Sequence, residues 1–341
     1  MRRSKNIEPG MTPALETDSM HSEWGQVTLP PVDTAEEVYG ELEFGGCDLN
    51  FIDRLENNTP TPREELYFPS AGEIAFSTQQ ELEVANAEML ELLNSSPGLE
   101  GVVGNDDRIR VQNTLDPNYP WSRKICSLIV TTQSGQRLRG TGWIAGERLV
   151  MTAAHNLYIH ERGGWPLSVT VIPGRNGFRA PFNHFTVGAE HLVVTRGWKQ
   201  RRELASDLGG IVIPVDYSRR FIPQTGYFAI RCLDDRKLAR SRTNIVGYPV
   251  RTNPVGSQWW HGRRVLPDVG PQTFQYNVDT TRGQSGSPAF IYDGTHRFVV
   301  GIHNVDAGPF NQAVRINQNV LKKIRQWKRD AEGFPINDSR D

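Results

Sequence analysis

The sequence predicts an all-β body with one C-terminal α-helix, preceded by a largely irregular acidic N-terminal segment. Three observations support this prediction: short β-like segments recur beyond residue 101, a helical pattern occupies residues 317–328, and the charge balance changes near residue 100. Many short strands at nearly regular spacing, separated by Gly, Pro and Asn turns, are typical of a β-sandwich or barrel.

Charge divides the chain into two parts. The 341 residues carry a formal net charge of −1, yet residues 1–100 hold 20 Asp and Glu against five Lys and Arg. The remaining 241 residues hold 33 Lys and Arg against 19 Asp and Glu. Because such asymmetry indicates an acidic module joined to a basic one, we expect residues 1–100 to be an acidic pro-segment or N-terminal extension and residues 101–341 to be the folded domain.

The first hundred residues show little regular pattern. Residues 1–75 are rich in Pro, Glu, Thr and Ser, which predicts extended or disordered chain. A helix is expected at residues 78–93, where Thr78 and Glu81 have the spacing of a capping box. No apolar stretch approaches the roughly 20 residues that span a bilayer, and the start lacks the apolar core of a signal peptide. We expect no membrane association.

The predicted strands combine β-branched and aromatic residues with flanking turn residues. They lie at residues 126–132, 141–145, 148–152, 168–172, 210–215, 226–230, 244–248, 273–278, 289–292, 298–303 and 312–316. At residues 317–328 the period changes, because Val320, Ile324 and Trp327 recur at helical spacing with Lys and Arg between them. We expect this helix to dock on the β body.

Cysteines, histidines and basic clusters give no sign of a cofactor. Cys47, Cys126 and Cys232 lack CxxC spacing, so buried free thiols are favoured over a single bridge. Five histidines have no carboxylate or cysteine neighbour at ligand spacing and are interpreted as surface or loop residues: His160, His184, His191, His261 and His296. Basic clusters at residues 199–202, 263–264 and 322–329 lack interleaved aromatic motifs. We therefore expect no metal and no nucleic acid.

Small residues lead directly into His155, since Thr152, Ala153 and Ala154 precede it. Small neighbours let an imidazole lie at the edge of a cleft, where it can transfer protons near neutral pH. Asp207 enters a strand that is predicted to be buried, and a buried carboxylate needs a hydrogen-bond partner such as an imidazole N–H. Taken singly, His155 could equally be a structural or surface residue, and Asp207 a turn residue before a strand.

Glycines flank Ser285 in the segment Gly-Gln-Ser-Gly-Ser-Pro at residues 283–288. Glycines let the backbone turn consecutive N–H groups inward, which can present a hydroxyl beside an oxyanion hole. An ordinary loop is the alternative. The order His155, Asp207, Ser285 on an all-β background is the order of chymotrypsin-type serine proteases. The three motifs together predict a catalytic triad.

From about residue 101 to residue 327 the chain resembles the glutamyl endopeptidases, a family of chymotrypsin-like serine proteases. The resemblance rests on residues 101–108, 152–155, 206–211, 283–288 and 301–303. It implies two chymotrypsin-like six-stranded antiparallel β-barrels with the active site in the crevice between them. It also implies His155 as general base and acid, Asp207 as the group that orients it, Ser285 as nucleophile, and the backbone N–H groups of Gly283 and Ser285 as the oxyanion hole.

The resemblance further implies a preference for glutamate before the scissile bond. Its carboxylate would be recognised by Thr280, His303 and, after processing, the α-amine of Gly101, because charge-assisted donors offset the desolvation of a carboxylate. After His303 the chain reads Asn-Val-Asp-Ala-Gly, where the family has an aromatic residue and a pair of glycines. A serine protease of other specificity is therefore the alternative, with His303 a strand-end residue packed under the cleft.

Glu100 directly precedes Gly101, so an enzyme that prefers glutamate would find a self-processing site there. We expect a secreted, monomeric zymogen that needs no cofactor, acts on polypeptides and is held by its own acidic segment until it is cleaved at this bond. A permanent N-terminal extension is the alternative to a removable segment. A catalytically silent protease-fold module that binds partners is the alternative to an enzyme.

Overall fold

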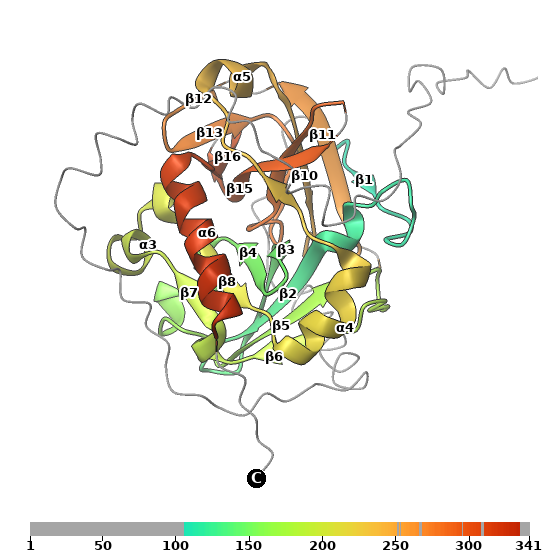
Figure 1. The fold of residues 1–341 in the computed structure, drawn as a ribbon, viewed down its shortest axis with the longest axis vertical. Helices are drawn as coiled ribbons and strands as arrows, with labels where there is room; N and C mark the ends of the chain where they lie inside the picture. Colours follow the sequence, from blue (N-terminus) through green and yellow to red (C-terminus); the bar gives the residue numbers. More distant parts are fainter. Residues whose placement is uncertain are drawn as a thin grey trace, which may run out of the picture. The chain divides into compact units, whose positions relative to one another are not determined.

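The structure is a computed structural model, and it describes residues 106–250, 252, 254–265, 268–294, 296–307 and 310–334. The acidic segment at residues 1–100, the helix expected at residues 78–93 and Gly101 all lie outside the described residues. The described chain forms two curled antiparallel sheets and a C-terminal helix (Figure 1). This confirms the predicted all-β fold.

The first sheet has seven antiparallel strands among the described residues. In spatial order they are β6 (Phe185–Val187), β5 (Ser168–Pro173), β2 (Ile125–Thr131), β3 (Arg137–Gly146), β4 (Leu149–Thr152), β8 (Gly209–Val212) and β7 (Leu192–Val194). Every second residue of β2 enters one core, since Cys126, Leu128 and Val130 pack there with Val150 and Ile211. Cys126 is thus a buried free thiol, and burial raises the pKa of this thiol.

The second sheet has nine strands in the described part of the chain. Eight follow the order β1 (Ile109–Arg110), β11 (Trp259–Val265), β10 (Arg242–Gly247), β14 (Pro288–Tyr292), β15 (Arg297–Ala307), β16 (Phe310–Arg315), β13 (Thr273–Tyr276) and β12 (Asp268–Val269). The ninth, β9 (Ala229–Ile230), pairs with β15 in parallel. The core packed on this second sheet includes Ile245, Phe274, Tyr276 and Val300.

The strand counts exceed the six per barrel that the resemblance implied. In the second sheet the three additional strands are short: β1, β9 and β12 have two residues each, and two residues give no alternation that a sequence pattern can detect. The seven-residue strand β11 was also missed, because its sequence Trp-Trp-His-Gly-Arg-Arg-Val carries few apolar residues.

Four α-helices occur among the described residues: α3 (Arg196–Arg201), α4 (Val215–Thr225), α5 (Asp235–Arg240) and α6 (Gln318–Glu332). The strand predicted at residues 210–215 was too long: β8 ends at Val212, and helix α4, which the sequence did not predict, begins at Val215. Pro214 directly precedes α4, and Tyr217 and Ile222 bury its inner face in the core of the first sheet. No helix in the described part of the chain is long and apolar enough to cross a membrane.

Helix α6 confirms the predicted C-terminal helix and lies against both sheets (Figure 1). The Asn317 side chain caps it by accepting a 3.0 Å hydrogen bond from the N–H of Val320. Leu321, Ile324 and Trp327 are buried in a core that also holds residues of both sheets. The helix therefore fastens the chain end across the junction of the two sheets.

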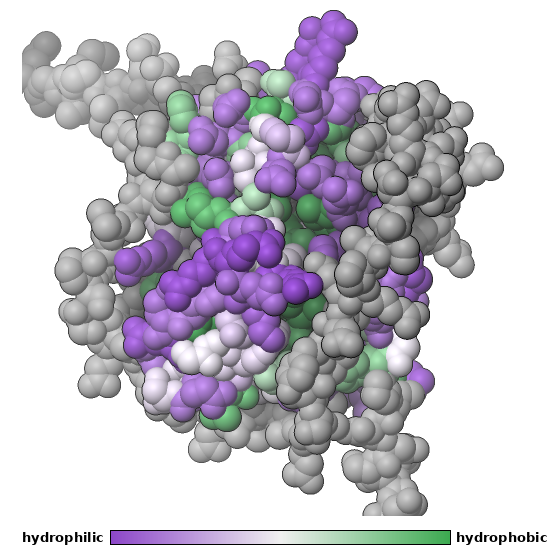
Figure 2. All heavy atoms as spheres, turned by 90° about the vertical axis from the view of Figure 1, so that its left-hand side faces the viewer, coloured by the Kyte–Doolittle hydropathy of each residue, from purple (hydrophilic) through white to green (hydrophobic). Residues whose placement is uncertain are grey.

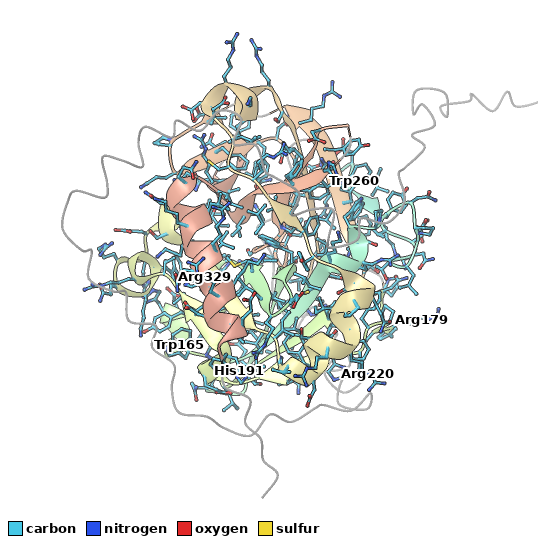
Figure 3. All side chains as sticks on the ribbon, viewed as in Figure 1. Trp165, Arg179, His191, Arg220, Trp260 and Arg329 are labelled. Carbon is cyan, nitrogen blue, oxygen red and sulfur yellow. The ribbon has the colours of Figure 1, made fainter. Side chains whose placement is uncertain are left out.

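Aromatic rings fill much of that shared core. Phe228 lies between the sheets, with its ring centroid 6.1 Å from Trp143 of β3 and 5.7 Å from Phe290 of β14. Trp260, in the upper half of Figure 3, continues the cluster through Trp121 at 6.3 Å. These ring contacts make the junction a packed apolar layer that fixes the sheets relative to each other. The surface differs from this core, since the part coloured in Figure 2 is mostly hydrophilic, with smaller apolar areas between.

Candidate active site

His155 lies where the first sheet meets the second. Strand β4 runs into a 3-10 turn at Ala154–Asn156 that carries the imidazole at its centre. Ala153 and Ala154 are fully buried, so the turn lies directly on the core. The His155 side chain keeps 29% of its surface exposed. The imidazole is therefore anchored but reachable from solvent.

Asp207 anchors His155. It follows the 3-10 turn Leu204–Ser206, precedes β8 and is 1% exposed. Its Oδ2 lies 2.7 Å from Nδ1 of His155, and its Oδ1 accepts a 2.9 Å hydrogen bond from the backbone N–H of His155. Because an ionised carboxylate can only accept, the imidazole donates from Nδ1, and Nε2 is the nitrogen left for proton transfer. The structure thus brings together the two residues that their motifs suggested.

The pKa of His155 is raised above its ordinary value. Burial lowers it, but the negative charge of Asp207, the hydrogen bond to that carboxylate and the charge of Glu161 together outweigh burial. The ring of Trp198 also lies beside the imidazole, with 6.0 Å between centroids. His155 therefore holds a proton more tightly than a free histidine and becomes a neutral base only at higher pH.

Ser285 lies on the turn before β14. Gly283 and Gly286 have φ of +94° and +88°, in the left-handed region that favours glycine. A Cβ on Gly286 would lie 2.1 Å from both the carbonyl oxygen of Thr141 and Oγ1 of Thr152. The turn is therefore pressed against β3 and β4 so closely that a side chain at position 286 would collide with them.

The backbone N–H groups of this turn differ in whether they have a hydrogen-bond acceptor. The N–H groups of Gln284, Gly286 and Ser287 donate to the carbonyl groups of Thr281, His303 and Gln284, respectively. Within the described part of the chain, the N–H groups of Gly283 and Ser285 have no acceptor. Neighbouring backbone donors without acceptors are what an oxyanion hole requires.

Hydrogen bonds connect the turn at residues 283–287, here called the serine turn, to β3 and to the 3-10 turn Ala154–Asn156 that carries His155. The carbonyl oxygen of Ser285 accepts from the backbone N–H of Thr141 and from Nδ2 of Asn156, each at 2.9 Å. Asn156 directly follows His155 in the chain. The turn that carries Ser285 is therefore bonded to the residue next to His155, although Ser285 and His155 are 130 positions apart in sequence.

His303 and Thr280 are buried next to the serine turn, with 2% and 0% exposure. The backbone N–H of His303 donates to Ser287 at 2.9 Å, and its carbonyl accepts from Gly286 at 2.7 Å. His303 thus lies inside β15 rather than at a strand end. Gly101, the third residue assigned to this pocket, is outside the described residues.

Tyr276 contacts His303 and was missed by the sequence analysis. Its Oη lies 2.7 Å from Nδ1 of His303, and the carbonyl oxygen of Gln312 lies 3.1 Å from the same nitrogen. Because a carbonyl can only accept, Nδ1 carries a proton. Tyr276 stood in a predicted strand, but only the pairing of β13 with β16 and β16 with β15 brings it to His303.

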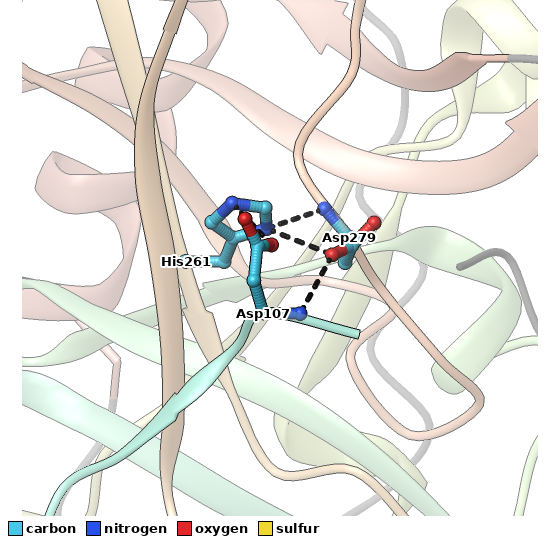
Figure 4. A group of neighbouring side chains, drawn as sticks. All are labelled: Asp107, His261 and Asp279. Carbon is cyan, nitrogen blue, oxygen red and sulfur yellow. Dashed lines mark hydrogen bonds and ion pairs between the residues drawn. The ribbon is translucent and has the colours of Figure 1, made fainter. Parts of the chain in front are cut away.

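Of the five histidines interpreted as surface or loop residues, three are buried: His184, His191 and His261. His261 of β11 lies between Asp107 and Asp279 (Figure 4). In the described part of the chain, these three residues form the group whose side chains could hold a metal ion, with ligand atoms within 4.8 Å of one another. Both imidazole nitrogens already make hydrogen bonds: Nδ1 accepts from the N–H of Asp279 at 2.8 Å, and Nε2 lies 2.9 Å from Asp107. Hydrogen bonding accounts for the cluster, and the absence of a metal stays a prediction.

Comparison with known proteins agrees with this geometry. No protein-family model matches the chain. A glutamyl endopeptidase of Bacillus licheniformis is 31% identical over 244 residues, which cover 69% of this chain and 71% of that protein. An extracellular metalloprotease of Bacillus subtilis is 22% identical over 227 residues, covering 66% and 69%. The solved structure of a Glu endopeptidase matches with a TM-score of 0.56 and 22% identity, covering 67% of this chain and 99% of that chain.

The solved structure shows that the two sheets have the chymotrypsin-like fold. The identity of the Bacillus licheniformis relative, 31% over more than two thirds of each chain, shows common family membership. The chain belongs to the glutamyl endopeptidase family of chymotrypsin-like serine endopeptidases.

Proposed function

We propose that the chain hydrolyses peptide bonds through an acyl-enzyme on Ser285, with His155 as general base and acid and Asp207 as the group that orients it. The observation that carries this proposal is the pairing of His155 Nδ1 with the buried Asp207 carboxylate at 2.7 Å. In the same turn, the side chain of Asn156 donates to the backbone carbonyl of Ser285. A buried carboxylate that fixes the imidazole tautomer is the arrangement that general-base catalysis needs.

The reaction proceeds in two balanced halves. Nε2 of His155 takes the proton from Oγ of Ser285 as Oγ attacks the substrate carbonyl, and the C–O bond forms. The same proton then passes to the leaving amine as the C–N bond breaks, which leaves an ester on Ser285. Water repeats the sequence: it loses a proton to His155, attacks the ester, and the proton returns to Oγ of Ser285 as the acid product leaves.

The N–H groups of Gly283 and Ser285 stabilise the tetrahedral intermediate in both halves. They stand two residues apart on a turn of left-handed glycines and have no acceptor within the described residues. Such preorganised donors strengthen as the carbonyl oxygen gains charge, and removing one typically costs about 10²–10³ in kcat.

The same proposal assigns glutamate preference to the pocket of Thr280, His303 and the α-amine of Gly101. Since Nδ1 of His303 carries a proton toward the carbonyl of Gln312, protonation at Nε2 would give a charged ring with a second donor. An imidazolium and an ammonium would supply the charge-assisted bonds that a buried glutamate carboxylate requires. The relative named a glutamyl endopeptidase supports this assignment.

We also propose that residues 1–100 are a pro-segment removed from a secreted, monomeric catalytic domain at residues 101–341. The split of negative charge before and positive charge after residue 100 supports this proposal. A removed acidic segment would associate with the basic domain through charge, so salt should weaken that association. Cleavage after Glu100 would create the α-amine of Gly101 that completes the pocket.

Replacing Ser285 with Ala should abolish turnover, with kcat falling by about 10⁴-fold or more, because the nucleophile is lost while the fold is kept. A fluorophosphonate probe should label the wild-type chain once and the Ser285→Ala chain not at all. Equal labelling of both chains, or peptide hydrolysis by Ser285→Ala, would contradict the assignment.

Replacing Glu161 with Gln should move the acidic limb of kcat/KM to lower pH. His155 must be neutral to act, and the charge of Glu161 contributes to its raised pKa, so removing that charge lets the imidazole deprotonate at lower pH. Because Glu161 is 67% exposed, the shift should shrink as salt is added.

The matched control for this pH profile is Glu147→Gln, since Glu147 is an exposed glutamate that does not shift the pKa of His155. Its acidic limb should coincide with that of the wild type. An acidic limb of Glu161→Gln that stays in place at low salt, or moves to higher pH, is the result that the account does not allow.

Mass spectrometry of the active wild-type enzyme should find an N-terminus at Gly101. Replacing Glu100 with Gln should leave residues 1–100 attached or shift the cut elsewhere, because the charge that the pocket recognises is removed. The inactive Ser285→Ala chain should stay unprocessed if the cut is made by the enzyme itself. Unchanged cleavage of Glu100→Gln at the same bond, or a mature start far from Gly101, would overturn the proposal.

A further inference from the structure

The first described residues of the catalytic body contact the turn that carries the nucleophile. Residues 106–108, here called the N-terminal clamp, precede β1 and lie about 170 residues before that turn in sequence. None of the three belongs to the proposed triad or pocket. Their contacts converge on residues 279–284, the stretch that leads into Ser285.

Arg108 makes the central contacts of the clamp. Its Nη1 donates to Oγ1 of Thr281 at 2.6 Å and to Oε1 of Gln284 at 3.0 Å. Its Nε and Nη2 donate to the two carboxylate oxygens of Asp106 at 2.8 and 2.7 Å. The guanidinium lies 5.9 Å from the centre of the Trp259 ring, and its side chain is 8% exposed. The guanidinium group of Arg108 is thus held by the Asp106 carboxylate, by the oxygens of the stretch at residues 279–284 and by the Trp259 ring.

Asp107 supports the same stretch through Asp279 and His261 (Figure 4). The backbone N–H of Asp107 donates to Oδ2 of Asp279 at 3.3 Å, and its side chain meets Nε2 of His261 at 2.9 Å. Nδ1 of His261 accepts the backbone N–H of Asp279 at 2.8 Å. The N-terminal clamp therefore holds the beginning of the stretch as well as its end.

Gln284 connects the N-terminal clamp to the oxyanion hole. It lies between Gly283 and Ser285, whose N–H groups are the proposed oxyanion donors, and it is fully buried. Its Oε1 accepts from Arg108 and also from the backbone N–H of Thr281 at 3.0 Å. A shift of the Gln284 side chain would therefore rotate the peptide groups on either side of it.

We propose that Arg108 is a positioning residue for the oxyanion hole: its hydrogen bonds to Thr281 and Gln284 keep the N–H groups of Gly283 and Ser285 aimed at the substrate oxyanion. This inference rests on the proposed function of Ser285. It predicts an effect confined to states in which the carbonyl oxygen carries charge, because the donors gain most strength there.

The chemistry of the site requires an arginine rather than any cation. One planar group binds a carboxylate through two nitrogens and two neutral oxygens through the third. A lysine has a single nitrogen on a flexible stem and cannot hold both sides at once. Lysine at position 108 should therefore restore only part of the function.

The test compares Arg108→Gln, Arg108→Lys and Thr281→Val with the wild-type chain, all with the same N-terminus by mass spectrometry. Two inhibitors distinguish the charged tetrahedral state from ground-state binding. A peptide aldehyde forms a hemiacetal with Ser285 and uses the oxyanion hole, whereas a reduced-bond peptide has no carbonyl at the scissile position. Arg108→Gln should lower kcat by about 10- to 100-fold and raise the aldehyde Ki by a similar factor.

In the same variant, KM and the Ki of the reduced-bond peptide should change by less than about twofold, because the ground state does not depend on the oxyanion donors. Arg108→Lys should recover part of kcat. Thr281→Val keeps the shape of its side chain and removes one acceptor of Arg108, so it should lower kcat in the same direction even if Arg108→Gln folds poorly.

Arg231→Gln is the matched control. Arg231 also pairs with a carboxylate, Asp293 at 3.4 Å, and lies over an aromatic ring, Phe298 at 3.6 Å, but it contacts no residue of the serine turn. Its kinetics should match those of the wild type.

Folded Arg108→Gln and Thr281→Val with wild-type kcat and aldehyde Ki would overturn the inference. Equal weakening of both inhibitors would also overturn it, since that result indicates a structural role alone. Failure of the proposed function would look different: the wild-type chain would not bind the aldehyde covalently, or Ser285→Ala would stay active.

Discussion

The fold depends most on the hydrogen bonds that cross from Thr141 to the serine turn. In the proposed mechanism, a nucleophile on the second sheet meets a base on the first, and Thr141 joins the first sheet to the turn that carries the nucleophile. Its N–H donates to the carbonyl of Ser285 at 2.9 Å, and its Oγ1 donates to the carbonyl of Gly283 at 2.7 Å and accepts from the N–H of Tyr248 at 2.9 Å. Thr141 is fully buried, so water does not compete for these bonds. The aromatic core between the sheets keeps both partners rigid around them.

Burial sets the chemical character of the site, because the buried Asp207 carboxylate and the buried His303 imidazole are held by hydrogen bonds. Asp207 is buried and gives both oxygens to His155, and His303 is buried and has its Nδ1 fixed by Tyr276 and Gln312. Unpaired polar groups in such a place would cost several kcal/mol each. Within the described residues, the backbone N–H groups of Gly283 and Ser285 have no acceptor. In the proposed mechanism, this pair of donors binds the negative charge that develops on the substrate oxygen.

Much of this was predictable from local sequence, and the remainder required tertiary contacts. Alternating strands, the helix over Ile324 and Trp327, and the small or glycine residues around His155 and Ser285 are local signals, and each led to the correct element. Strand β11 was missed because polar residues and a glycine follow its two tryptophans, and helix α4 because the apolar run of β8 continues as far as its first residue, Val215. The contact of Arg108 with Gln284 joins residues 176 positions apart, so no local pattern contains it. His261 was misjudged for the same reason: its carboxylate neighbours, Asp107 and Asp279, are neighbours only in space.

The central claim is that Ser285 becomes covalently acylated during turnover. The most direct measurement is to mix the chain with an activated ester of an N-blocked glutamate, quench with acid before the acyl group is hydrolysed, and locate that group by peptide mass spectrometry. The account predicts one acyl group per chain, on Oγ of Ser285, because His155, held by Asp207, would take the proton from that hydroxyl as it attacks. An acyl group on a different residue, or rapid ester hydrolysis with no acylated chain at any quench time, would contradict it.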